Sequence, residues 1–306
     1  MKLQSSSVLQ LRRALWGALV ALTLGLTSCT TPDAVTGQSV YNIYTIQDDI
    51  KLGQDAMSTN LEELRKQGVR MNADPYRVAQ INTIMRRITE ASDMPQLPYE
   101  ITLVHTQVVN ACAMPGGQMI VFEGLYDARN GLVRDEDELA AVIAHEIAHV
   151  NCRHSTERLS KLMTAGMIAE LAAAVAESQD ADDWATAIRA IFAVGATLWI
   201  PTYTRTDEYE ADRVGLFYMA RAGYDPRAAP RIWRRVAEEE GGSWGIMSIF
   251  ATHPANKARY EALEKLVPHA MEEYLAATGQ YPPGYTPGQN MAPLDYNFDW
   301  RRPDGK

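Results

Sequence analysis

The sequence predicts an α+β fold that is mainly helical, with a small β-sheet beside one almost wholly apolar helix. Apolar residues recur at helical spacing over residues 48–66 and 75–91, and the second stretch opens with a capping aspartate and a proline. Residues 100–105 alternate and are rich in β-branched side chains, and residues 118–122 form a second apolar strand. Residues 139–150 form helices readily and are apolar on nearly every side. With 46% hydrophobic residues in a total of 306, the chain is long enough to bury an enzyme-sized core.

The N-terminus has the pattern of a secretory leader. Residues 1–28 have a basic start, an apolar run that is short for a membrane span, and small or polar residues before Cys29. Leu26-Thr27-Ser28-Cys29 resembles the bacterial lipoprotein cleavage box, in which the cysteine becomes the acylated first residue. An ordinary signal peptide and an uncleaved anchor are the alternatives. Because Thr30 stands where an aspartate would favour the inner membrane, we expect an outer-membrane lipoprotein on the periplasmic face of a bacterial envelope.

Three regions follow the leader. Residues 29–44 are polar, with a proline and a glycine, and are typical of a tether between lipid and domain. Residues 45–268 hold the predicted helices and strands, and we expect them to form one folded domain. Residues 269–306 are rich in proline and tyrosine, which predicts an irregular tail. The net charge of −9 and the lack of basic runs beyond short doublets argue against nucleic-acid binding.

Two apolar segments raise the question of a membrane span. Residues 162–176 are interrupted by Glu170, and residues 184–200 are interrupted by Arg189. Each falls short of the ~20 uninterrupted apolar residues that a spanning helix needs. We therefore expect a helical hairpin packed near the helix of residues 139–150 rather than a membrane span.

The helix of residues 139–150 carries the first chemical motif, His-Glu-Ile-Ala-His. His145 and His149 are four residues apart, so both imidazoles lie on one face and can reach one ion. Glu146 lies about 100° round the helix, beside the ion rather than on it. Solvated histidines on an amphipathic helix are the alternative, but burying these groups without a partner would cost several kcal/mol. Zinc with three protein ligands and a neighbouring glutamate suits the hydrolysis of a peptide bond.

Both ends of this helix are charged. Asp135-Glu-Asp-Glu138 lies at the N-terminus, where the helix dipole favours acidic residues. Arg153, His154 and the charged residues after them are typical of a salt-bridged helix end. His154 is five residues past His149, which on a continuous helix places it off the ligand face.

A third metal ligand is needed, and Glu170, Glu177 and Glu208 are the downstream candidates. Glu208 is followed four residues later by Asp212, so both carboxylates fall on one helical face. One carboxylate can bind the metal while the other orients a ligand histidine. The other two glutamates have alanines at the same offset. A solvated pair facing neighbouring arginines is the alternative for Glu208 and Asp212.

Taken together, these residues resemble the HtpX and CAAX-prenyl-endopeptidase family of zinc metallopeptidases, which are gluzincins with a zincin-like core. The resemblance covers about residues 45–268. It rests on four motifs, which are Asn110 to Gly117, His145 to His149, Arg153-His154-Ser155, and Glu208 with Asp212. It implies that one zinc ion per chain is bound by His145, His149 and Glu208, with Glu146 as general base and Asp212 supporting a ligand histidine. Many members carry transmembrane helices around the motif, and this sequence departs from them there.

His253, in Thr252-His253-Pro254, precedes a predicted helix that begins near residue 255. Histidine-proline at this place also occurs in the resembled family. His253 can stabilise the oxyanion, fill the fourth zinc position and keep the enzyme latent, or serve as a structural cap. Tyr203 and Tyr209 are further candidates for the oxyanion donor.

Two cysteines remain once Cys29 carries lipid. Cys112 and Cys152 form an even pair that an oxidising compartment can join, and such a disulfide would stabilise the fold by roughly 4 kcal/mol. Two buried thiols are the alternative. A fourth-ligand role for Cys152 is disfavoured because it would close the open zinc position.

The substrate class follows from the predicted sheet near residues 110–122. A sheet edge beside a metal helix can pair with an extended peptide through backbone hydrogen bonds, which predicts unfolded or flexible protein substrates. Together with the family resemblance and the leader, this implies a lipid-anchored zinc endopeptidase for damaged envelope proteins. The alternatives are a zinc-containing chaperone or assembly factor of the outer membrane with little proteolysis, and a zinc hydrolase acting on other bonds. No oligomeric state is indicated.

Overall fold

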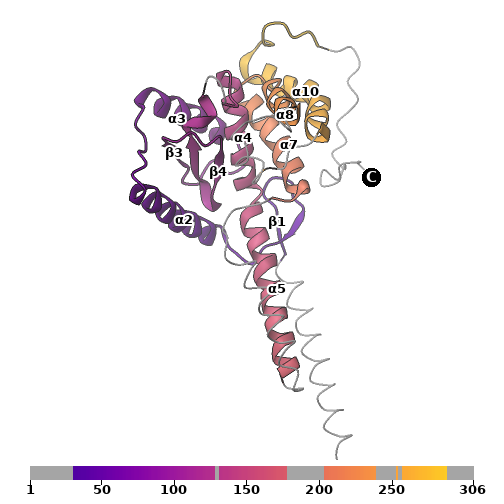
Figure 1. Ribbon diagram of the computed structural model, residues 1–306. Coiled ribbons are helices and arrows are strands. Elements are labelled where there is room, and N and C mark those ends of the chain that lie inside the picture. The colour runs from indigo at the N-terminus through magenta and orange to yellow at the C-terminus, as the bar shows by residue number, and fades with distance from the viewer. Residues whose placement is uncertain (1–29, 128–130, 178–202, 239–252, 254–256, 288–306) are drawn as a thin grey trace, which may run out of the picture.

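The computed structural model describes residues 30–127, 131–177, 203–238, 253 and 257–287. Within these residues the protein is mainly helical, with one three-stranded sheet and one short hairpin (Figure 1). The predicted class, α+β and mainly α, is confirmed.

The elements lie close to the predicted ones. The helices are α2 (Ile46–Lys66), α3 (Pro75–Glu90), α4 (Glu136–Asn151), α5 (His154–Glu177), α7 (Arg205–Arg221), α8 (Ala228–Glu238) and α10 (Lys257–Thr278). The strands are β1 (Thr30–Pro32), β2 (Ser39–Tyr41), β3 (Glu100–Val104), β4 (Ala111–Ala113) and β5 (Gln118–Phe122), with 3₁₀ turns at Pro115–Gly117 and Glu123–Tyr126. The side chain of Asp74 caps α3 as the sequence predicts, with Pro75 in the first turn. Thr45 caps α2 in a capping box with Asp48.

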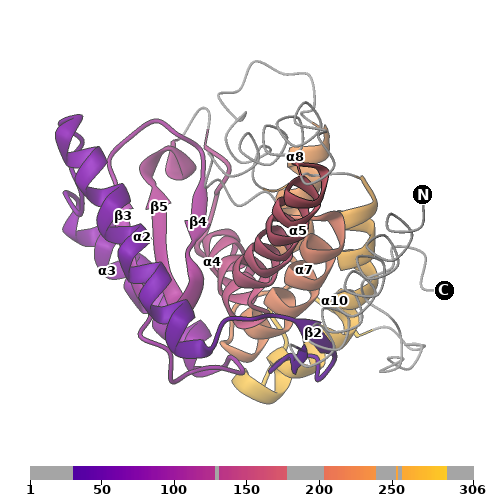
Figure 2. The same cartoon turned by 90° about the horizontal axis from the view of Figure 1, so that it is seen from below.

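The sheet has the order β3-β5-β4, with β3 parallel and β4 antiparallel to β5. Gly116 and Gly117 turn the chain between β4 and β5 with φ angles of 73° and 107°, a region that favours glycine. The α2 helix crosses this turn so closely that a Cβ on Gly53 would lie 1.8 Å from the Pro115 oxygen. Strand β4 is the edge nearest α4, as Figure 2 shows.

The α4 helix is the centre of the molecule, and every residue from Glu138 to Asn151 is buried. The sheet covers one side of it and α7 covers another (Figure 2). Gly215 lets α7 approach closely, because a Cβ there would lie 3.0 Å from the backbone of Ala144 and His145. This contact fixes the distance between the helices that carry the two halves of the candidate site.

The predicted tether at residues 29–44 is wrong for the part that the structure describes. Residues 30–41 form the β1–β2 hairpin, and the chain after it lies on α5. Asn42 is buried and donates to the Thr156 hydroxyl at 3.0 Å, while the Ser160 hydroxyl donates to Asn42 at 3.1 Å. Two polar residues of the expected linker, Asp33 and Asn42, are instead buried with satisfied hydrogen bonds, so the folded domain begins within a residue of Cys29.

The tail begins later than predicted. The α10 helix continues through Pro268 to Thr278, ten residues beyond the expected boundary. Ala270 and Met271 are fully buried in the core, and this anchoring outweighs the backbone hydrogen bond that the proline removes. Residues 288–306 of the predicted tail lie outside the described part of the chain.

The predicted packed hairpin is wrong for its first segment, and its second segment, 184–200, lies outside the described residues. The α5 helix extends away from the body of the molecule (Figure 1), with Leu162, Met163, Met167 and Ile168 between 43% and 67% exposed. These side chains point in several directions around the helix, so no single face can bury them all. None of the helices described here has the length and apolarity to cross a bilayer.

Candidate metal centre

The two histidines of α4 converge with a carboxylate of α7. The Nε2 atoms of His145 and His149 are 3.1 Å apart, as expected for one helical turn. Glu208 lies in the first turn of α7, behind the Thr204 cap, and its carboxylate oxygens are 3.4 Å from Nε2 of His145 and 3.5 Å from Nε2 of His149. All three side chains are buried. The structure thus brings together the three ligands that the sequence proposed.

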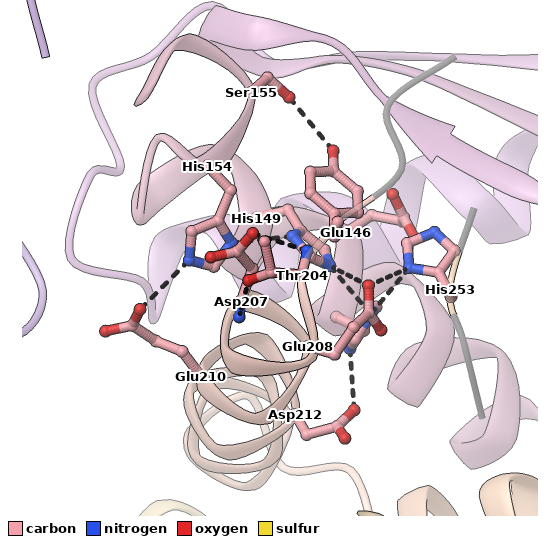
Figure 3. A network of polar contacts seen from close by, with 12 residues as sticks. Glu146, His149, His154, Ser155, Thr204, Asp207, Glu208, Glu210, Asp212 and His253 are labelled. Carbon is pink, nitrogen blue, oxygen red and sulfur yellow. Dashed lines mark hydrogen bonds and ion pairs between the residues drawn. The ribbon is translucent and has the colours of Figure 1, made fainter. Parts of the chain in front are cut away.

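His253 joins this cluster from the segment before α10 (Figure 3). Its Nδ1 atom is 3.0 Å from a Glu208 oxygen and 3.3 Å from Nε2 of His145. One ligand atom from each of His145, His149, Glu208 and His253 lies within 4.8 Å of the others, which is the spacing of a metal-binding group. The cap interpretation of His253 does not account for this position.

Glu146 lies beside the cluster and not in it. One of its oxygens is 3.2 Å from Nε2 of His253, and among the described residues the other oxygen is buried without a hydrogen-bond partner. A buried carboxylate oxygen of this kind is costly unless a further group reaches it. Two imidazoles and a carboxylate with such a neighbour are the donor set of a catalytic zinc site, so the residues present fit a zinc ion.

Asp212 supports His145 from the side opposite the cluster. Its Oδ1 is 3.0 Å from Nδ1 of His145. Arg259 of α10 makes two 2.7 Å contacts to Asp212 and one 2.7 Å contact to Glu208, and its guanidinium lies 3.9 Å from the centre of the Trp233 ring. Sequence reasoning missed Arg259. The signal for it was the pair of carboxylates on one buried helix face, which requires a cation.

The surroundings of His149 are different. Its Nδ1 lies 2.8 Å from Nδ1 of His154, whose Nε2 lies 3.2 Å from Glu210 (Figure 3). The ring of Tyr203 stacks on His149 with 3.7 Å between ring centres, and its hydroxyl lies 3.2 Å from that of Ser155. The expected ion pairs are present at Arg153 and His154, and His154 is not in the ligand group, but the continuous helix on which its position was predicted is wrong. The α4 helix stops at residue 151, and the chain then turns and folds His154 back under His149.

In the cluster, burial and neighbouring charges shift the pKa of each group in opposite directions. Burial raises the pKa of Glu208, but Arg259 and His253 outweigh it and hold that pKa well below its usual value. Burial lowers the pKa of His253, but Glu208 and Glu146 reverse the shift and raise it to about 10. Glu208 is therefore ionised, the form in which a carboxylate binds a metal.

The predicted disulfide is not formed, because Cys112 and Cys152 are free thiols. Cys112 lies on β4, where burial and then the charge of Glu146 raise its pKa to about 12. Cys152 caps the end of α4, six residues or about 9 Å beyond Glu146, which puts the two sulfurs in different surroundings. Cys29 lies outside the described residues.

A buried helix pair that presents two imidazoles, a carboxylate and an adjacent glutamate defines a metal-dependent hydrolase. Residues 75–267 match Peptidase family M48, and the chain belongs to this family. Membership of a peptidase family and the donor set of the cluster agree with each other.

Relatives of known name are similar along much of the chain. "Mitochondrial metalloendopeptidase OMA1" of Schizosaccharomyces pombe is 31% identical over 237 residues, which cover 77% of this chain and 66% of the relative. "Beta-barrel assembly-enhancing protease" of Escherichia coli K12 is 24% identical over 312 residues, covering 96% of this chain and 61% of the relative. "Putative beta-barrel assembly-enhancing protease" of Vibrio cholerae is 30% identical over 211 residues, covering 64% and 42%.

These comparisons correct the expected branch. The family that the sequence resembled is right at the level of M48, but the relatives named above do not place the chain with HtpX or the CAAX-prenyl endopeptidases in particular. The chain spans less than two thirds of the length of each of these relatives.

Proposed function

We propose that the protein is a zinc-dependent endopeptidase, anchored by lipid in a bacterial envelope, that cleaves unfolded or damaged envelope proteins. The observation that carries this proposal is the convergence of His145, His149 and Glu208 on one point, with Glu146 beside it. A site built only for structure would have no use for a fourth side chain, the differently aimed carboxylate of Glu146.

The ligand set assigns the parts of the reaction. His145, His149 and Glu208 would hold one zinc ion, which supplies a Lewis acid for a carbonyl and lowers the pKa of water. Glu146 would take a proton from the attacking water and give it to the leaving amine. The Tyr203 hydroxyl faces Ser155, which makes it a poor oxyanion donor in this arrangement.

His253 supports the latent alternative better than the oxyanion alternative. Its Nδ1 lies among the ligand atoms and its Nε2 lies on the Glu146 carboxylate. In this position it would serve as a fourth ligand to a bound ion, and it covers the Glu146 carboxylate. We propose that the described conformation is a resting one and that His253 must leave before a peptide can react.

Strand β4 supports extended protein substrates. Among the described strands it pairs only with β5, so no described strand pairs with its other edge, beside α4. Cys112 of β4 lies close enough to Glu146 for the charge of that glutamate to raise the pKa of the thiol. A peptide that adds to this edge would run past the base and would bind through its backbone, with little demand on its sequence.

The envelope setting is supported by the leader pattern and by the printed name of the E. coli relative. Because β1 begins at Thr30 and is part of the folded domain, a lipid on Cys29 would hold the catalytic domain close to the bilayer. The same relative's name also supports the alternative function, an assembly factor with little proteolysis.

The test is casein cleavage by the full chain purified in detergent, with zinc content measured on every sample. We compare wild type with Glu146→Gln, and use Glu136→Gln, an exposed glutamate of the same helix, as the matched control. We expect all three to bind one zinc ion and only Glu146→Gln to lose cleavage, by at least ~100-fold.

Other outcomes are equally informative. Absence of zinc in wild type would overturn the metal assignment. Zinc without cleavage in wild type, but with cleavage in His253→Ala, would establish latency. Zinc without cleavage in both would favour the assembly factor.

A further inference from the structure

We propose that His154 and Glu210 are positioning residues that fix the tautomer and the orientation of the metal ligand His149. The three side chains form a buried chain that runs away from the metal cluster, and each is at most 4% exposed. The inference rests on the proposed zinc site and adds to it a second supporting chain, on the opposite side from Asp212.

The order of donors along this chain is set at its far end. The Glu210 carboxylate and the Arg213 guanidinium interact through their charges, and a carboxylate paired with a cation accepts hydrogen bonds without donating one. Nε2 of His154 must then carry the hydrogen that points to Glu210, at 3.2 Å. In the form of His154 that carries one N–H, its Nδ1 is therefore left as an acceptor.

This acceptor selects one form of His149. The Nδ1 atoms of the two rings are 2.8 Å apart, a distance that needs one hydrogen between them, and in this form of the pair His149 supplies it. With its hydrogen on Nδ1, His149 presents the lone pair of Nε2 to the cluster, where Nε2 of His145 is 3.1 Å away. The opposite tautomer would point a hydrogen at the ion and could not bind it.

The two residues that flank His154 in the chain fix the position of this turn and help to hold the His149 ring. Arg153 has a φ of 55°, a conformation costly for a residue with a side chain, and its guanidinium bonds Asp49 at 3.1 Å and the Tyr44 carbonyl at 2.6 Å. Ser155 contacts the hydroxyl of Tyr203, whose ring covers His149. The Arg153-His154-Ser155 motif is therefore one turn with three contacts, two of which act on His149.

The chemistry of the pair argues for a role in metal binding. A buried polar chain of two imidazoles and a carboxylate gives little net stability compared with apolar side chains of similar volume. It does leave the lone pair of Nε2 of His149 ready for a metal. Metal-ligating histidines almost always donate their second N–H to a partner, and the loss of that partner lowers the affinity for the metal.

The test compares two replacements of His154 in the full chain. His154→Asn retains an amide oxygen near the position of Nδ1, and His154→Leu retains apolar volume but no acceptor. His105→Leu is the control, because His105 also pairs with a glutamate, Glu123, but lies outside the cluster. The readouts are the zinc dissociation constant from chelator competition and the melting temperature of the metal-free protein.

We expect His154→Leu to weaken zinc binding by ~10–100-fold, and His154→Asn to recover most of that loss. His105→Leu should bind zinc as wild type does. A purely structural role predicts the reverse pattern, in which the melting temperature of metal-free His154→Leu falls while the zinc affinity of the folded protein is unchanged. That result would overturn the inference, as would equal weakening in the Asn and Leu variants. If wild type itself binds no zinc, the proposed function fails first and separately.

Discussion

His145 and His149 are the same residue type, one turn apart on one helix, yet their partners differ. His145 is backed by Asp212 and, through it, by the full charge of Arg259. His149 is backed by the imidazole of His154. Burial lowers the pKa of both rings, but Asp212 and Glu208 reverse the shift at His145, while at His149 the pKa stays well below the usual value.

The difference shows that helical spacing and protonation are set by different parts of the chain. The four-residue offset decides which way the rings face. The partners decide the protonation of each ring. His145, whose pKa is raised, loses a proton at a free-energy cost when it binds a metal, whereas His149 is already neutral. The two supporting chains therefore make separate predictions.

The largest effect is expected at Arg259, which backs Asp212 behind His145. Arg259→Met keeps apolar volume against Trp233 but leaves the buried carboxylates of Asp212 and Glu208 without their cation. We expect the free energy of unfolding to fall by about 3–5 kcal/mol, measured by urea denaturation in the presence of a chelator. Arg234→Met is the control, since Arg234 pairs with Glu264 at the exposed surface and should cost less than ~1 kcal/mol. Similar losses in the two variants would show that the buried arginine is not special.

The features that depend on the spacing of apolar residues and on helix caps could be predicted from the sequence. The strands near residues 100–105 and 118–122 and the cap at Asp74 follow from local rules, and the structure has each of them. The choice of Glu208 over Glu170 followed from a second carboxylate one turn on, and the structure places Glu208 in the cluster and Glu170 on the protruding α5.

The parts that escaped prediction depend on chain reversals and on burial of polar groups. His154 looked remote because a continuous helix was assumed, and the turn at Arg153 brings it back. Arg259 lies 51 residues after Glu208 along the chain, so no local pattern joins them. Asn42 looked like part of a linker because its buried partners are on α5, more than 100 residues later.

A second prediction uses pH to separate the two histidines. Because the pKa of His145 is raised, protons compete with zinc for that ring, and affinity falls as pH drops through this raised value. Asp212→Asn removes one of the two carboxylates that raise it. We expect zinc affinity at high pH to fall by ~10–100-fold from the lost support, and the remaining loss on acidification to begin at a lower pH than in wild type. The measurement is the zinc dissociation constant across pH. An unchanged pH profile in the variant would mean that Asp212 does not control the protonation of His145.

The smallest effect is expected at the Tyr203 hydroxyl. Tyr203→Phe keeps the ring stacked on His149 and loses only the contact with Ser155. One hydrogen bond is worth about 0.5–1.5 kcal/mol, so the melting temperature should fall slightly while zinc affinity stays close to that of wild type. Tyr203→Leu, which also removes the stacked ring, should weaken zinc binding more than Tyr203→Phe. If the two variants bind zinc equally well, the ring does not restrain His149, and the His154 hydrogen bond alone must hold that ligand in place.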